Sequence, residues 1–246
     1  MKTSPSATRL EHDLLGERQV PAEAYYGIHT LRAMENFPIT GTTIQSSPSL
    51  VTALACVKQA CALANHELGE LDDERTAAIV QACQDIRRGN YHEQFVVDVI
   101  QGGAGTSTNM NANEVIANRA LEILGRARGD YGFLHPLEHV NLSQSTNDVY
   151  PTAVKLALRI EIERLAEAMD VLRVDFQKKA DEFAHVLKMG RTQLQDAVPM
   201  TLGQEFSTYA VMLEEDRERL REAALLIQEI NLGATAIGTG INAPPD

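Results

Sequence analysis

Three short stretches of the sequence concentrate small side chains that donate hydrogen bonds. They are GGAGTSTN at 102–109, SQSTND at 143–148 and GRTQLQD at 190–196. Each is expected where a loop leads into a helix or joins two helices, and the backbone N–H groups of helix N-termini attract anions. Hydroxyls and amides add directed donors to that field. The three stretches together therefore indicate a site for a small ligand with carboxylates.

Helix capping is the alternative reading of any one stretch, because serine, threonine and asparagine are ordinary N-cap residues. Three stretches in one chain, each several donors deep, are less well explained by capping alone. Two further spacings are set aside. Gly103 and Gly105 match the first two glycines of a dinucleotide-binding loop, but its third glycine and its preceding strand are missing. The HPLEH spacing at 135–139 lacks a third zinc ligand, so no metal site is expected.

Composition describes a folded, acidic protein. The chain has 246 residues, a formal net charge of −12 and 44% hydrophobic residues. This length supports a sizeable core in one or two domains. The negative charge argues against nucleic acid and against an anionic membrane as partners, because either would need a basic face. An acidic protein can still bind a small anion through a few local donors.

Several features favour a cytoplasmic protein. No apolar window reaches the length of a membrane span, and the first residues lack the apolar core of a signal peptide. The cysteines are Cys56, Cys61 and Cys83, an odd and sparse set. Without a secretion signal, such a set is typical of reduced thiols in the cytosol.

The spacing of apolar residues predicts a mainly α fold. Apolar residues recur at spacings of three and four from Ser49 to Gly69, and a second helix is expected over 72–89. A short helix is expected around 95–101. Another is expected over 109–124, with its N-cap near Asn109. Residues 1–48 are expected to form an irregular arm with at most short strands.

The second half carries two heptad-like seams, which predict helices of roughly 35 and 30 residues. Pro199 is expected to open the second helix and Gly233 to close it, and no strand of any length is expected here. The first seam is Leu158, Ile162, Leu165, Met169, Leu172, Phe176 and Phe183, and the second includes Leu202, Phe206, Tyr209, Leu213 and Leu220.

We therefore expect a small N-terminal domain over 1–145, followed over 146–246 by the first long helices of a truncated central helical bundle. Two helices alone would leave their apolar seams exposed. Further helices or other subunits must cover them, since exposed apolar seams associate.

At greater length the three stretches resemble the aspartase/fumarase superfamily. The matching segments are GGAGTSTNMNANEVIANRA, HVNLSQSTNDVYPTA and KMGRTQLQDAVPMTLGQEF, in the family's order. The resemblance extends to DLLGERQVPAEAYYGIHTLRAMENF and INLGATAIGTGIN and covers nearly the whole chain. GAGTSTN and QSTND are similar to the aspartase branch, whereas fumarases tend to read GSGTQTN and QSSND. Gln193 also fits that branch, because fumarases carry histidine there.

The resemblance implies an ammonia-lyase that converts L-aspartate reversibly to fumarate and ammonia, with no organic cofactor. It implies a homotetramer built on a helical core, with active sites formed between subunits. It also implies that the substrate-binding residues are Thr106 from the first motif, Ser145, Thr146 and Asn147 from the second, and Thr192 and Gln193 from the third.

The family's catalytic serine has no counterpart in the sequence. The resemblance places that general base in a glycine–serine–serine loop of the family's second half, which would lie beyond Asp246. The chain resembles about the N-terminal half of the family, and we expect this piece to be inactive alone. The alternatives are a class II fumarase, a relative acting on another succinyl-type substrate, and a non-catalytic fragment or structural module.

Overall fold

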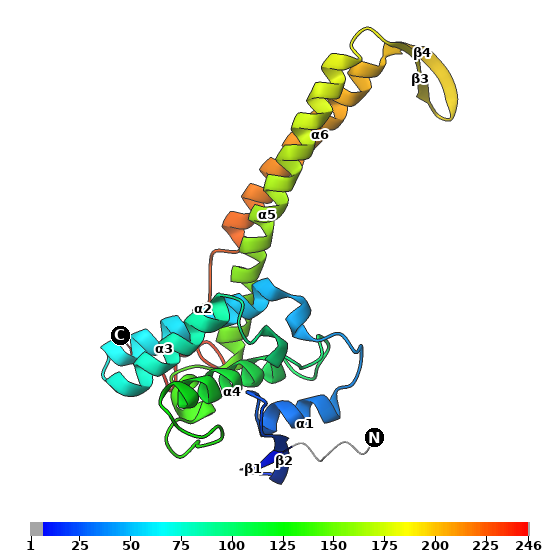
Figure 1. Cartoon of the computed structure of the whole chain (residues 1–246). Helices are drawn as coiled ribbons and strands as arrows, with labels where there is room; N and C mark the ends of the chain where they lie inside the picture. Colours follow the sequence, from blue (N-terminus) through cyan, green and yellow to red (C-terminus); the bar gives the residue numbers. More distant parts are fainter. Residues whose placement is uncertain (1–6, 246) are drawn as a thin grey trace, which may run out of the picture. The chain divides into compact units, whose positions relative to one another are not determined.

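The protein is described by a computed structural model over residues 7–245. It divides into two compact units (Figure 1). Unit 1 contains the chain up to Ala157 and again from Ile230 onward, and unit 2 is Leu158–Glu229. The sequence predicts a domain boundary between residues 145 and 146, whereas these units divide twelve residues later, inside a helix. None of the helices in the described range is long and apolar enough to cross a membrane.

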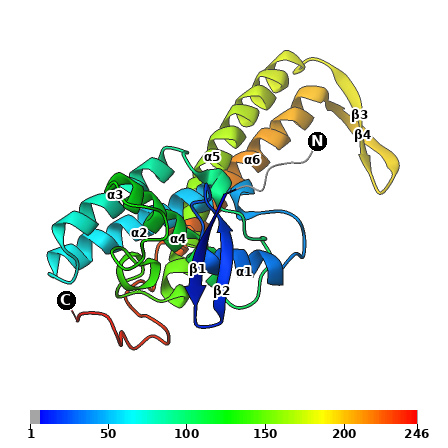
Figure 2. The same ribbon diagram turned by 60° about the horizontal axis from the view of Figure 1, so that its bottom comes forward.

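Unit 1 begins with an antiparallel hairpin and continues as helices. The hairpin is β1 (Thr8–Asp13) and β2 (Gly16–Pro21), and it lies beside α1 (Ile28–Asn36), as Figure 2 shows. The further elements are η1 (Ile44–Ser46), α2 (Pro48–Glu67), α3 (Asp73–Arg87), η2 (His92–Gln94), α4 (Thr106–Ile123), the π-helix η3 (Pro136–Val140) and the first turns of α5 (Thr146–Glu182).

The core of unit 1 lies between α2, α3 and α4, of which α2 and α3 run side by side (Figure 1). Leu54, Ile79 and Ile116 represent the three helices there, and each is completely buried. The predicted helices at 49–69 and 72–89 are confirmed to within two residues. Asp72 caps α3 by accepting a hydrogen bond from the Arg75 backbone, as the sequence indicates.

The short helix expected around 95–101 is wrong, because this segment is extended. Its backbone bonds to the segment before α2: the N–H of Ile44 donates to the Val97 carbonyl, and that of Val99 donates to the Thr42 carbonyl. Thr43 and Asp98 also form an isolated antiparallel β-bridge, and Phe95 and Val97, two residues apart, are both buried. Residues two apart lie on the same face of an extended segment.

The helix expected from Asn109 begins three residues earlier, at Thr106. Its N-cap is Gly105, whose φ of +88° ends the glycine loop without a steric penalty. Asn109 is therefore not a cap; it is buried inside α4. The error arose because a polar N-cap was expected, although glycine is also accepted at that position.

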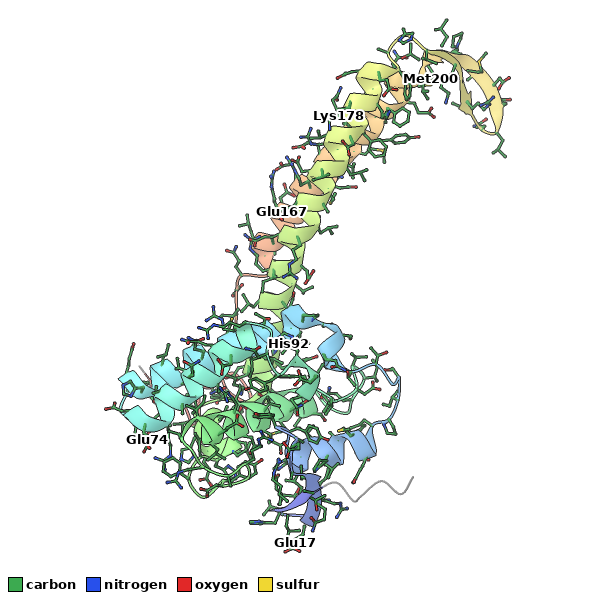
Figure 3. All side chains as sticks on the ribbon, viewed as in Figure 1. Glu17, Glu74, His92, Glu167, Lys178 and Met200 are labelled. Carbon is green, nitrogen blue, oxygen red and sulfur yellow. The ribbon has the colours of Figure 1, made fainter. Side chains whose placement is uncertain are left out.

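Unit 2 is a helical hairpin interrupted by strands. It contains α5 from Leu158 onward, then β3 (Leu187–Thr192), β4 (Gln195–Thr201) and α6 (Leu202–Leu226). Glu167 and Lys178 lie on α5, and Met200 lies on β4 (Figure 3). The expectation of no strand in the second half is thus wrong, since β3 and β4 form an antiparallel pair.

The second long helix begins later and ends earlier than expected. Pro199 lies in β4, opposite Met189. The helix begins after Thr201, whose side chain forms a capping box with Gln204. It ends at Leu226, seven residues before Gly233. The local capping pair, not the proline, therefore determines where α6 begins.

Aromatic and ionic contacts join α5 to α6. The Phe176 ring lies 5.4 Å from the Tyr209 ring, the Phe183 ring lies 5.7 Å from that of Phe206, and Arg217 pairs with Asp170. Much of the predicted seam nevertheless remains open. Leu158, Leu165 and Leu172 of α5 are each about half exposed in this chain. The prediction of a mainly α fold that opens a helical bundle is confirmed.

We predict that Asp98→Asn lowers the stability of the folded protein at neutral pH, and that this loss becomes smaller as the pH falls. Burial would raise the pKa of Asp98, but hydrogen bonds from the backbone of Ile100, Thr40 and Gly41 and from the Thr40 hydroxyl lower it to about 2. The ionised carboxylate therefore stabilises the folded state above about pH 4, and this contribution disappears as the pH falls toward 2.

Thermal unfolding from neutral pH down to about pH 2.5 checks this. The difference in Tm between wild type and variant should shrink as the pH falls. A constant difference would contradict the assignment. Glu23→Gln is the control, because the Glu23 side chain is 95% exposed.

Candidate active site

The first motif opens α4, and α4 buries an unusual number of polar side chains. Buried polar groups need partners, and those of α4 find them in several different loops. The buried residues are Thr108, Asn109, Asn111, Asn113, Glu114 and Asn118.

Near the motif, Thr108 and Asn111 hold the preceding segment. The backbone N–H of Thr108 donates to Gln101 Oε1, and Gln101 Nε2 donates to the Thr108 hydroxyl at 2.7 Å. Asn111 accepts from the Val96 backbone and donates to the Gln94 carbonyl. The segment 94–101, which precedes the glycine loop, is thereby hydrogen-bonded to α4 near both of its ends.

Glu114 and Glu11 together cap α1. Glu114 accepts from the backbone N–H groups of Gly27, His29 and Thr30, and Glu11 accepts from that of Ile28. Four N–H groups at the start of α1 are thus satisfied by two buried carboxylates, which the helix dipole also favours. This cap positions α1 against the first turn of α4.

A cavity of about 510 Å³ opens beside that first turn, and Thr106 lines it. From α1 the cavity is lined by His29 and Arg32. The hydrogen bond that His29 Nδ1 donates to Glu114 Oε1 raises the pKa of His29, and Arg32 forms a two-point ion pair with Asp13. Thr106 itself is exposed at the first position of α4. The cavity wall also carries the Glu35 carboxylate, so it is the hydroxyl at the N-terminus of α4 that suits an anion here.

The second motif forms the start of α5 in unit 1. The buried Asp148 accepts from the Ser145 backbone at 3.0 Å and from the Thr235 backbone at 2.9 Å. The Asn147 side chain donates to the Ala236 carbonyl. Ser145 and Asn147 are therefore tied to the returning segment 230–245, and one Asn147 N–H group is already engaged.

The structure brings the first two motifs together. A Cβ on Gly105 would lie 2.4 Å from the Tyr150 ring, so the glycine loop packs directly on α5. Asn109 Nδ2 donates to the Thr146 hydroxyl at 3.0 Å. Ser145, Thr146 and Asn147 do not line the cavity at Thr106, but they lie at the adjoining helix start.

The third motif lies in unit 2 and forms the β3–β4 hairpin. Thr192 ends β3 opposite Gln195, and Gln193 and Leu194 make the turn with φ of +48° and +61°. Positive φ at both central residues is the geometry of tight hairpins. The sequence predicts only a loop here, because the usual Asn-Gly signal is absent. Thr192 and Gln193 are exposed, and their role in binding stays a prediction.

Lys58 was missed at the sequence level. It is completely buried on α2 and donates to Asn141 Oδ1 and Gln144 Oε1, next to the second motif. A signal was present, because Lys58 is the only charged residue in the run LVTALACVKQACALA. A lysine inside such a run is either solvated or buried with partners, and periodicity alone does not separate the two.

Comparison with known proteins agrees with the motifs. The sequence profile of a family described as Lyase matches residues 16–246. An aspartate ammonia-lyase of Pseudomonas aeruginosa is 60% identical over 98% of this chain and 51% of its own length.

Solved structures agree on the fold. A fumarate lyase:delta crystallin of Brucella melitensis bound to cobalt superposes with a TM-score of 0.95 at 60% identity, over 97% of this chain and 52% of that one. A class II fumarase of Schistosoma mansoni superposes with a TM-score of 0.91 at 37% identity, over 97% of this chain and 50% of that one.

The chain belongs to this lyase family, within the aspartase/fumarase superfamily. Its relatives are carbon–nitrogen lyases of the aspartate ammonia-lyase type. The chain spans about half the length of the curated relatives that it matches, which is the N-terminal half expected from its motifs.

We predict that Gly105→Ala destabilises unit 1 by about 2 kcal/mol or more, because it adds positive-φ strain to an overlap with the Tyr150 ring. Gly125→Ala is the matched control: Gly125 has a φ of +69° but open space around its Cβ position. It should cost only about 1 kcal/mol. Urea unfolding followed by circular dichroism measures both. Equal costs would show that the contact with Tyr150 contributes nothing.

Proposed function

We propose that the full-length protein containing this chain is an ammonia-lyase that converts L-aspartate reversibly to fumarate and ammonia. The observation that carries the proposal is the 60% identity, over 98% of the chain, to an aspartate ammonia-lyase. The motifs support it, because neutral donors gather where α4 and α5 begin. Such donors suit a dicarboxylate.

The reaction depends on charge that develops on one carboxylate. A base removes a proton from the carbon next to the β-carboxylate of aspartate, and the electron pair moves into that carboxylate. The pair then returns to form the C=C bond, and the protonated amino group, –NH₃⁺, leaves with the C–N electrons as neutral ammonia. Preorganised donors stabilise the doubly charged carboxylate, as in an oxyanion hole. No cofactor is needed as an electron sink.

The donor roles follow the motifs. Gln193 can orient substrate but cannot serve as an acid, because an amide does not titrate in this range. The general base is assigned to the serine loop of the family's second half, outside the chain described here. The donors are Thr106 on α4, Ser145, Thr146 and Asn147 at the start of α5, and Thr192 and Gln193 in the β3–β4 hairpin.

A homotetramer in the cytoplasm completes the proposal. Helices of other subunits would cover Leu158, Leu165 and Leu172, whose half-exposed side chains are costly to leave in water. The cysteines are unpaired, as expected of a reducing compartment.

A class II fumarase is the second candidate, because the fold superposes closely on one. Gln193 argues against it, since the family's fumarases carry histidine at that position. A structural module without catalysis is the third candidate.

To separate these functions, the chain is continued with the C-terminal half of the Pseudomonas aeruginosa relative and assayed by the ultraviolet absorbance of fumarate. We expect fumarate from L-aspartate and none above background from L-malate. The reverse pattern would establish a fumarase, and no turnover of either would favour the module. Thr106→Ala should lower kcat/KM about a hundredfold, as loss of one oxyanion donor does. Thr208→Ala is its control, because Thr208 is an exposed hydroxyl residue on α6 outside the three motifs.

The 246-residue piece is tested separately. We expect no fumarate from L-aspartate with the purified chain alone, because the assigned base is missing from it. Turnover above background would show that the base lies within these residues. Size-exclusion chromatography of the same sample distinguishes a tetrameric module from an aggregate formed through the exposed seam.

A further inference from the structure

Lys58 is an unusual titratable group, because its ammonium is completely buried against neutral partners. Nζ donates to Asn141 Oδ1 at 2.7 Å and to Gln144 Oε1 at 2.9 Å. Burial lowers the pKa of Lys58 to about 7, although Cys61, Cys83 and Asp148 act in the opposite direction. A buried ammonium is costly, so its retention calls for an explanation beyond packing.

The ammonium determines which way round its neighbours lie. Nζ donates to both side chains, as an ammonium must and as a neutral amine can with its two N–H groups, so Asn141 and Gln144 turn their oxygens toward it. Their NH₂ groups then face carbonyl oxygens: Asn141 Nδ2 donates to the Gln144 carbonyl, and Gln144 Nε2 donates to the carbonyls of Val140 and Leu142. Carbonyls only accept, so both amides are held in the same orientation from both ends.

The orientation of the Asn141 amide in turn fixes that of the Asn109 amide on α4. Asn141 Oδ1 also accepts from Asn109 Nδ2 at 3.1 Å, so Asn109 must present its NH₂ group. Asn109 Oδ1 has no hydrogen-bond partner within the described residues, so nothing there opposes this orientation. The same Nδ2 donates to the Thr146 hydroxyl at 3.0 Å. That hydroxyl accepts from Asn109 with one lone pair, and its own proton remains available to donate to a ligand.

We propose that Lys58 is a positioning residue that, through Asn141 and Asn109, sets the Thr146 hydroxyl to donate to a substrate carboxylate. The inference rests on the proposed function, which places Thr146 in the substrate site. A donor whose direction is set in advance needs no reorganisation when negative charge arrives. Without Lys58 the two amides are held only by the backbone carbonyls. The orientation of Asn109 and of the Thr146 hydroxyl is then fixed less firmly.

The test is a double-mutant cycle in the full-length chimera described above. Lys58→Gln offers a group that can donate or accept, and Thr146→Val removes the hydroxyl. We expect each single variant to raise KM for L-aspartate about tenfold, the worth of one hydrogen bond to a charged group. The double variant should be no worse than Thr146→Val alone. Additive effects, or an unchanged KM in Lys58→Gln, would overturn the proposal.

A matched pair on α4 keeps the test decisive if Lys58→Gln does not fold. Asn109→Leu breaks the chain of hydrogen bonds but leaves Lys58 with both partners. Asn113→Leu is its control, because Asn113 Nδ2 also donates to Asn141 Oδ1, at 3.3 Å, without contacting Thr146. We expect Asn109→Leu alone to raise KM, and only when Thr146 keeps its hydroxyl. Equal effects of the two substitutions on KM would contradict the positioning of Thr146 through Asn109.

Calorimetric titration with fumarate separates this proposal from the proposed function. The wild-type chimera could bind fumarate without turning over aspartate, while the effects of Lys58→Gln and Thr146→Val on the Kd for fumarate remain non-additive. This result would contradict the proposed function and support the positioning role of Lys58. If the chimera turns over aspartate and the two effects on Kd are additive, the positioning role of Lys58 is wrong and the proposed function is supported. Absence of both turnover and fumarate binding overturns both.

Discussion

Unit 1 depends on one requirement: α4 buries polar side chains that need partners. Among the described residues of α4, only Asn109 Oδ1 and Asn113 Oδ1 are buried side-chain atoms without one. An unpaired buried polar group costs about as much as several hydrogen bonds contribute, so the loops around α4 are held where the partners are needed. Asn111 holds the segment before the glycine loop, Glu114 holds the start of α1, and Asn118 holds the turn at Gly129. The helix α4 thus contributes both apolar residues to the core and buried polar residues that hold the surrounding loops in place.

The same requirement explains how an acidic protein can present an anion site. The net charge of −12 is spread over the chain, whereas the donors at α4 and α5 act at short range. Glu11 and Glu114 lie near the Thr106 cavity, but their oxygens are occupied by backbone N–H groups. Carboxylates that are hydrogen-bonded to the N–H groups of a helix start repel an incoming carboxylate less than free carboxylates would.

Unit 2 follows a different rule. Its helices associate through Phe176, Phe183, Phe206 and the Arg217–Asp170 pair, yet its heptad-like seam stays half exposed. The seam is longer than one helical partner can cover, which agrees with a family built around a larger helical bundle. The β3–β4 hairpin, which carries Thr192 and Gln193, lies between α5 and α6 in the sequence and belongs to this unit.

By itself the sequence determined the helical class, the family and its three motifs, because these depend on residue spacing and identity along short stretches. It could not place the strand 187–192, whose turn lacks a glycine signal, or the start of α4 at Thr106. Only the tertiary structure decided that Asn109 and Asn113 serve the protein's interior and that Lys58 reaches the second motif. Lys58 and Asn141 are 83 residues apart, and burial, which determines what a polar side chain must do, is set by such distant contacts.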